Sequence, residues 1–167
     1  MTDCNLGKRG LEQYRRRRSS TGHIHMDNPK EVHTFVAMMK EVGRYAEKAG
    51  VVIALEDWIS AEDNLRLLHA IGSEHLGVHY DARNIKVKVH DPYDEVRRLG
   101  RRSHQVRVKN REKLPGEPDL LDWPRLAEEF YSCWYVLENG SPSGDLVADA
   151  RRNTAYVRKT FRMPAAP

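Results

Sequence analysis

The chain has 167 residues, enough for one ordinary domain with its own hydrophobic core, and carries 28 lysines and arginines against 24 aspartates and glutamates. No apolar run approaches the ~20 residues of a membrane span, no signal-peptide pattern opens the chain, and the two cysteines lack metal-ligand spacing. We therefore expect a reduced, cytoplasmic protein. Because both signs of charge are interspersed after residue 27, neither a membrane nor nucleic acid is an expected partner.

Residues 1–26 differ from the rest of the chain, because they combine little apolar periodicity with a basic run from Arg15 to Arg18. We predict a basic, disordered arm here, followed by a folded region over 27–162 and a short tail over 163–167. An electrostatic contact with nucleic acid or a phosphorylated ligand is the other interpretation of the basic run.

From residue 27 onward, helical and strand patterns alternate strictly, at about 25 to 30 residues per unit. Capping residues and glycines mark where the helices begin and end. The expected elements, in chain order, are a helix from Pro29 to Gly50, a strand over 51–56, a helix from Ser60 to Gly72, a strand over 76–81, a loop through Asn84, a short helix from Asp91, a strand over 105–109, a helix opened by Asp122, a strand over 134–138 and a helix from about Asp145 to Phe161.

Strict alternation predicts the α/β class, with right-handed parallel βαβ units. Periodicity alone leaves two architectures open, an open doubly wound sheet and a curled barrel wall. Three of the four strands end in an acid, namely Glu56, Asp81 and Glu138. On an open sheet these carboxylates would be strung out in a line, whereas in a barrel they would converge on one axis, where a divalent cation can offset their repulsion. The acids therefore favour the barrel.

The acids also determine which side chains share their inward face, because side chains alternate along a strand. In the third strand the apolar pair Val106 and Val108 is expected to face the helices, which turns His104 away from the acids. The inward set predicted in this way consists of Val52, Ala54, Gly77, His79, Gln105, Arg107, Lys109, Trp134 and Val136.

Five motifs, in their order and spacing, resemble the xylose-isomerase-like TIM barrels of sugar phosphate isomerases and epimerases. They are 46–56 (AEKAGVVIALE), 78–84 (VHYDARN), 106–110 (VRVKN), Gly116 with Asp122-Trp123, and 134–138 (WYVLE). The resemblance covers roughly residues 27–162 and only the later part of such a barrel. A complete barrel needs about 200 to 250 residues. We therefore expect a partial (β/α) TIM-type barrel that lacks the early strands.

The resemblance implies a divalent metal, held in that family by a Glu, an Asp, a His and a second Glu. Three of these positions correspond to Glu56, Asp81 and Glu138, but the position of the histidine is occupied by Arg107. Arginine stays protonated and has no lone pair to give a metal, and its charge would compete for the same carboxylates. His79, one inward layer below Asp81, is the alternative nitrogen ligand.

The implied cofactor is Mn²⁺ or Mg²⁺, with Zn²⁺ or Co²⁺ as further possibilities, because hard carboxylate oxygens dominate the ligand set. The implied reaction moves a proton on a ketose through an enediolate, with Glu56 and Glu138 as the acid and base and the metal as Lewis acid. Lys109, Arg107 and His79 would contact the substrate, a small sugar or sugar phosphate.

Two other interpretations remain open at this stage. One is a catalytically inactive or truncated barrel fragment that works only in an assembly, as a homo-oligomer or with a missing barrel half. The missing strands and Arg107 favour it. The other is a relative of abasic-site endonucleases, whose sites need several metals and many histidines at the strand ends. This chain has few histidines there, so the endonuclease is the weaker hypothesis.

Overall fold

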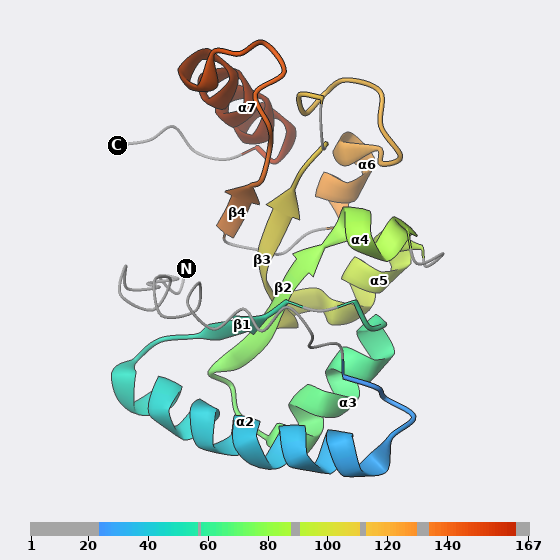
Figure 1. Cartoon of the computed structure of the whole chain (residues 1–167), viewed down its shortest axis with the longest axis vertical. Helices are drawn as coiled ribbons and strands as arrows, with labels where there is room; N and C mark the ends of the chain where they lie inside the picture. Colours follow the sequence, from blue (N-terminus) through green and yellow to red (C-terminus); the bar gives the residue numbers. More distant parts are fainter. Residues whose placement is uncertain (1–23, 57, 88–90, 111–112, 130–133, 163–167) are drawn as a thin grey trace.

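The computed structural model of the chain describes residues 24–56, 58–87, 91–110, 113–129 and 134–162 (Figure 1). Most of the predicted N-terminal arm, the predicted tail over 163–167, and Asp57 lie outside these residues. The described elements are α2 (Pro29–Ala49), β1 (Ile53–Leu55), α3 (Ala61–Ile71), β2 (Leu76–Asp81), α4 (Ala82–Val87), α5 (Pro92–Leu99), the 3₁₀ turn η1 (Gly100–Arg102), β3 (Ser103–Val108), α6 (Trp123–Glu128), β4 (Trp134–Leu137) and α7 (Leu146–Thr160).

Local signals in the sequence explain where the long first helix begins and ends. The Asn28 side chain accepts hydrogen bonds from the backbone N–H groups of Lys30 and Glu31, which would otherwise lack partners in the first turn of α2. Pro29 fits the first helical position because it has no N–H to satisfy there. Gly50 ends the helix in the left-handed conformation, with φ 64°.

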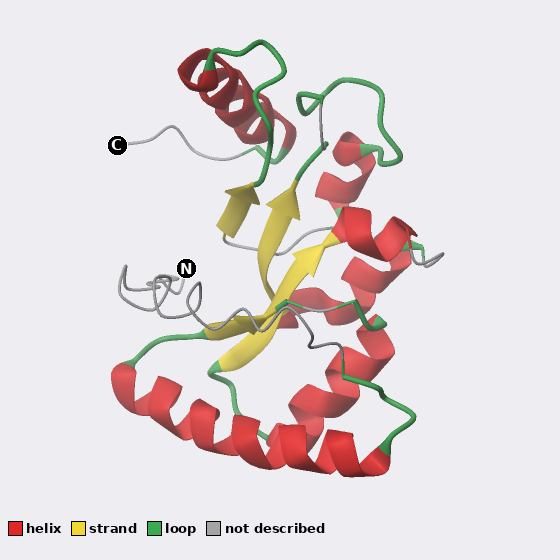
Figure 2. Ribbon diagram, viewed as in Figure 1, coloured by secondary structure: helices red, strands yellow, loops and turns green. Residues whose placement is uncertain are grey.

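The four strands form one sheet in the order β1-β2-β3-β4, and every neighbouring pair is parallel (Figure 2). The predicted α/β class, with parallel strands and alternating helices, is confirmed. Strand order follows chain order, which is the arrangement of a barrel wall. Strands β1 and β4 form the two edges of the described sheet.

The helices form a layer in the same order as the strands. Helix α2 contacts α3, α3 contacts α5, α5 contacts α6, and α6 contacts α7. In Figure 1, α3, α5 and α6 follow one another along one side of the sheet, and α7 lies beyond the end of β4. A carboxylate joins two members of this layer, because buried Glu95 of α5 accepts a hydrogen bond from the backbone N–H of Ala61, the first residue of α3.

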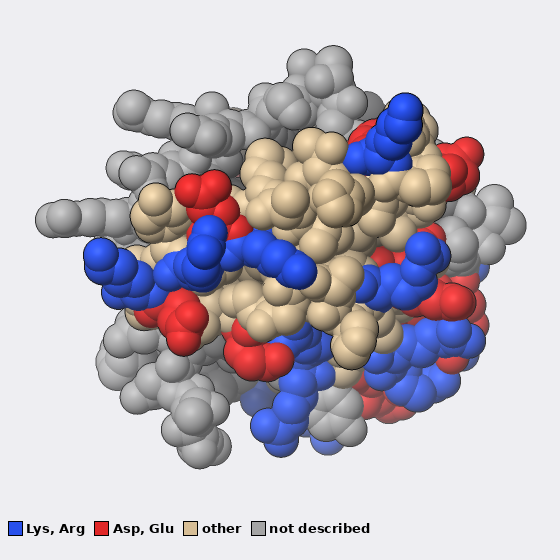
Figure 3. All heavy atoms as spheres, turned by 90° about the horizontal axis from the view of Figure 1, so that it is seen from below, with Lys and Arg blue, Asp and Glu red and all other residues tan. Residues whose placement is uncertain are grey.

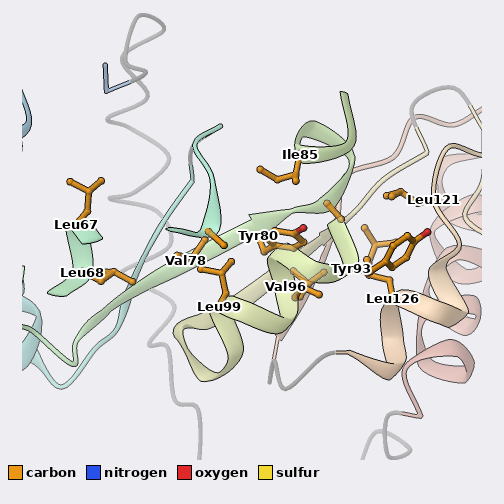
Figure 4. Packing of buried hydrophobic residues seen from close by; sticks show 14 of the residues in the cluster. Leu67, Leu68, Val78, Tyr80, Ile85, Tyr93, Val96, Leu99, Leu121 and Leu126 are labelled. Atoms are coloured by element: carbon orange, nitrogen blue, oxygen red, sulfur yellow. The ribbon is translucent and has the colours of Figure 1, made fainter. Parts of the chain in front are cut away.

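The hydrophobic core lies between the sheet and this helix layer (Figure 4). On the sheet side it is formed by Val78, Tyr80, Val106 and Val108, all nearly inaccessible to solvent. The predicted placement of the Val106 and Val108 pair against the helices is therefore correct. The hydroxyl of Tyr80 donates to the backbone carbonyl of Pro92 at 2.7 Å, so its one polar atom is satisfied inside the core. The facing helices contribute Leu67, Leu68, Val96, Leu99, Trp123 and Leu126.

The segment after β2 differs from the prediction, because residues 82–87 form helix α4 rather than a loop through Asn84. The cause is local. The Oδ1 atom of Asp81 accepts a hydrogen bond from the backbone N–H of Asn84 at 3.0 Å, which is the geometry of a helix N-cap. Asp81 thus ends a strand and caps the next helix.

His104 is the second correction, because it does not face away from the inward residues. The pairing shifts between Val78–Ser103 and His79–Gln105, which leaves His104 as an extra, bulged residue in β3. A Cβ atom built on Gly77 would overlap the His104 ring, so the ring lies over Gly77 on the inward face. The simple alternation rule failed here because it assumes a strand without a bulge.

The surface is mixed in charge. In the view of Figure 3, Lys and Arg alternate with Asp and Glu around an area without charged side chains. Two exposed apolar side chains of α2, Met38 and Tyr45, are more than half accessible. No helix within the described part of the chain is long and apolar enough to span a membrane.

Candidate functional site

The candidate site lies at the carboxyl ends of the four strands. Glu56 directly follows β1, Asp81 is the last residue of β2, Arg107 lies near the end of β3, and Glu138 directly follows β4. Asp81 and Arg107 are partners in the register of the sheet. The backbone N–H of Glu138 donates to the Val108 carbonyl at 3.1 Å, which extends the pairing of β3 and β4 by one residue. Parallel pairing therefore brings these side chains to the same edge.

Arg107 is the centre of this group. Its Nη1 and Nη2 atoms donate to the two carboxylate oxygens of Glu56 at 2.6 and 2.7 Å, a bidentate pair. The same Nη1 lies 2.7 Å from Oε2 of Glu138 and 3.6 Å from Oδ2 of Asp81. One nitrogen atom is thus in ion-pair contact with all three carboxylates that the sequence places at strand ends.

Lys109 supplies a second cation. Its Nζ atom lies 2.6 Å from Oδ2 of Asp81 and donates to Oδ1 of Asn84 at 3.1 Å. The Asp81 side chain is almost fully buried, at 1% exposure, and both of its oxygens are engaged, one by Lys109 and the other by the N–H of Asn84.

The three carboxylates differ in how accessible they are. The side chains of Arg107 and Glu56 are only 10% and 15% exposed, whereas the Glu138 side chain is 52% exposed. Glu138 is therefore the carboxylate of the group that a molecule in solution can reach. Arg107 and Glu56 form a mostly buried ion pair beside it.

His79 lies on the inward face next to this group and is buried. Burial, followed by the nearby Arg107 guanidinium, lowers the pKa of His79 to about 4, although the Glu56 and Asp81 carboxylates act in the opposite direction. His79 is therefore neutral near pH 7. Its Nε2 atom has no hydrogen-bond partner among the described residues, and neither has Nε of Arg107.

Two polar contacts beside the site join residues whose pairing the sequence did not suggest. Nη2 of Arg83, on α4, donates to Oδ1 of Asp119 at 3.3 Å, and both side chains are mostly buried. Buried Asn110 donates from Nδ2 to the carbonyls of Leu114 and Glu117, both at 3.1 Å. Asn110 thus fixes the loop after β3. The available signal was a polar residue directly after a strand, which is typical of loops that carry function.

The residues present do not fit the divalent metal that the family resemblance implies. Within the described residues, no group of three or more His, Cys, Asp or Glu side chains is arranged to hold a metal ion. Arg107 explains this result, because its guanidinium lies among the three carboxylates and offers no lone pair. The permanent positive charge of Arg107 offsets the repulsion among the three carboxylates, and the Glu138 side chain stays accessible to solvent.

The comparisons with known proteins agree with the geometry. The family described as xylose isomerase-like TIM barrel matches residues 17–160. No curated protein matches the chain. Among solved structures, an L-ribulose 3-epimerase matches with a TM-score of 0.71 at 16% sequence identity. The matched region covers 81% of this chain and 55% of the epimerase chain.

Two D-psicose 3-epimerase structures are similar as well. One, determined in the presence of D-fructose, matches with a TM-score of 0.69 at 14% identity, and the matched region covers 86% of this chain and 60% of the epimerase chain. The other, from Clostridium cellulolyticum H10 with D-tagatose, has a TM-score of 0.68 at 16% identity and covers 86% and 59%. The likeness in fold is clear, and the chain spans less than two thirds of the length of each of these structures.

Proposed function

Because the chain belongs to the xylose isomerase-like TIM barrel family, we propose that it binds a small sugar or sugar phosphate at the carboxyl ends of its strands, with a site of the sugar isomerase and epimerase type. The observation that carries this proposal is the convergence of Glu56, Asp81 and Glu138 on the Nη1 atom of Arg107. In the family such a strand-end position holds the chemistry.

The proposed roles follow from accessibility and pairing. Glu138 and Glu56 are the proposed acid and base for a proton on the ketose, with Glu138 as the group that reaches the ligand first because it is half exposed. Lys109 is proposed to support a substrate oxygen. Arg107 and His79 are proposed to line the base of the site.

Metal assistance is the part of the epimerase mechanism that this chain does not support. Mn²⁺ or Mg²⁺ would have to displace a bidentate guanidinium from Glu56 and break its contact with Glu138. We therefore propose that the chain as it stands binds these metals weakly and has little or no isomerase activity. It would then be a sugar-binding relative of the enzymes rather than an efficient catalyst.

An assembly role is the second candidate, and a separate observation favours it. The four described strands cannot close a barrel, so the outer edges of β1 and β4 remain open within the described part of the sheet. Exposed apolar side chains also occur on the first and last described helices, with Met38 and Tyr45 on α2 and Leu146 and Val147 on α7. We propose that a second copy of the chain or another barrel half covers these surfaces.

The test of the proposed function is a titration of the purified chain with D-psicose and with D-fructose, each in the presence and in the absence of Mn²⁺. Saturation-transfer NMR monitors the binding. We expect binding that Mn²⁺ does not strengthen, and weaker binding by the variant Glu138→Gln. The matched control is Glu41→Gln, which removes an exposed carboxylate from α2, a helix that contributes no side chain to the strand-end group. Failure of the folded chain to bind any ketose, or unchanged binding by Glu138→Gln, would overturn the proposal.

A further inference from the structure

The loop that follows β4 contains the dipeptide Asn139-Gly140, directly after the accessible carboxylate of Glu138. From the contacts of this dipeptide we infer that Asn139 is a site of spontaneous deamidation, at which the chain modifies itself. The inference concerns a covalent change in the loop beside the candidate site. It therefore goes beyond the proposed sugar-binding function and does not depend on it.

The reaction needs no reagent other than water. The backbone nitrogen of Gly140 attacks the side-chain Cγ atom of Asn139, and the C–N bond that forms closes a succinimide ring. The bond from Cγ to Nδ2 breaks, and ammonia leaves with the proton that the Gly140 nitrogen gives up. Water then opens the ring at either carbonyl carbon, which leaves aspartate or isoaspartate at position 139.

The attacking nitrogen is available in this structure. Gly140 is exposed and lies outside the helices and strands, and its backbone N–H makes no hydrogen bond to the described residues. Because glycine has no Cβ, its nitrogen can approach the preceding side chain with little steric hindrance. The first requirement of the reaction is therefore met.

The side-chain amide of Asn139 is held in a way that favours the attack. Its Oδ1 atom accepts a hydrogen bond from the backbone N–H of Asn110 at 3.2 Å. Asn110 is buried, and its own side chain holds it to the loop after β3, so this donor is fixed. A fixed donor stabilises the negative charge that develops on Oδ1 when Cγ is attacked. The leaving nitrogen, Nδ2, has no hydrogen-bond partner among the described residues, so its departure breaks no such contact.

Three other asparagines provide a comparison within the same chain. Asn28 precedes Pro29, whose nitrogen has no proton to give up. Asn64 and Asn153 lie inside helices α3 and α7, where the N–H group that follows each of them belongs to the helical hydrogen-bond ladder. We therefore expect these three side chains to stay intact while Asn139 reacts.

The product changes the loop next to the candidate site. Aspartate at position 139 adds a negative charge directly after Glu138, and isoaspartate also lengthens the main chain by one carbon atom. The backbone N–H of Glu138 donates to the Val108 carbonyl at 3.1 Å, so the change occurs one residue beyond the end of the β3–β4 pairing.

The test is mass spectrometry of the full chain after incubation in mildly alkaline buffer, with aspartate and isoaspartate counted at each asparagine after digestion. We expect Asn139 to deamidate at least about tenfold faster than Asn64 or Asn153, because one donor to a developing oxyanion changes a rate by at least this factor. Gly140→Ala should slow the reaction at Asn139, because the added Cβ hinders the attacking nitrogen. Equal rates at the three asparagines, or an unchanged rate in Gly140→Ala, would overturn the inference.

A second incubation, in guanidinium chloride, separates the effect of the fold from that of the dipeptide. The unfolded chain keeps Asn139-Gly140 but loses the Asn110 donor. We expect Asn139 to react at least as fast in the folded chain as in the unfolded chain, whereas Asn64 and Asn153 should react more slowly when folded. An Asn139 that reacts in guanidinium chloride and stays intact in the folded chain would show that the fold protects it, and the inference would be wrong.

Discussion

Replacing Arg107 tests most directly whether a guanidinium has taken the place of a metal. In the variant Arg107→His, Glu56 loses a bidentate partner and Glu138 loses its ion pair. Removing one partner of a buried ion pair costs about 3–5 kcal/mol. Because Glu138 is half exposed, we take the lower end, about 3 kcal/mol, which corresponds to a fall in Tm of about 6–12 °C for a chain of this size.

The histidine also supplies the imidazole that the family pattern places there, so Mn²⁺ should restore part of the loss. At a metal concentration 100 times Kd the gain is about 2.7 kcal/mol. The control is Arg107→Gln, which removes the same charge without adding a strong metal ligand, and whose Tm should fall similarly without recovering. Thermal unfolding followed by circular dichroism, with and without Mn²⁺, measures all three proteins. The reasoning is refuted if the native chain gains as much Tm from Mn²⁺ as the histidine variant, or if the glutamine variant recovers too.

Three further predictions follow from burial, packing and the open sheet edges. The pKa of His79 is about 4 in the folded state, against 6.5 in the unfolded chain, so the unfolded chain takes up the proton first as the pH falls. The free energy of unfolding should therefore fall by up to about 3 kcal/mol between pH 6.5 and pH 4. Urea denaturation across this range should show a larger fall for the native chain than for His79→Gln. Gly77→Ala should lower the free energy of unfolding, measured by urea denaturation, by about 1–3 kcal/mol, because the added Cβ overlaps the His104 ring. Adding His104→Ala to this variant should recover part of the loss, but not the part caused by the nearby Arg102 carbonyl. Light scattering should find the purified chain oligomeric or aggregating, and a sharp monomer peak with cooperative unfolding would contradict the open-edge argument.

The parallel fold could be predicted from the sequence because its signals are local. Caps such as Asn28 and stops such as Gly50 lie within a few residues of the backbone groups they satisfy. Continuous apolar runs identify buried parallel strands without knowledge of their neighbours. Strand order then follows from the tendency of successive βαβ units to lie side by side.

The parts that could not be predicted depend on contacts between distant residues or on departures from regular geometry. The bulge at His104 is invisible to a rule of strict alternation, and it moved one side chain to the other face. The Arg83–Asp119 pair joins residues that are 36 positions apart, one on helix α4 and the other in the loop before α6. At the candidate site, residue types and strand positions could be read from the sequence, but the bidentate geometry of Arg107 and the N-cap role of Asp81 required coordinates.

The strands lie in the sheet in the same order as in the chain, and this order affects how the protein folds during synthesis. As the chain leaves the ribosome, each strand from β2 to β4 finds its hydrogen-bonding neighbour already synthesised. Every parallel pairing therefore closes only the connection between two consecutive strands rather than a loop of half the chain, which keeps the entropic cost of each step small. Assembly can proceed one unit at a time from the N-terminal side, and β4, the last of the described strands, brings Glu138 to an arginine that is already synthesised.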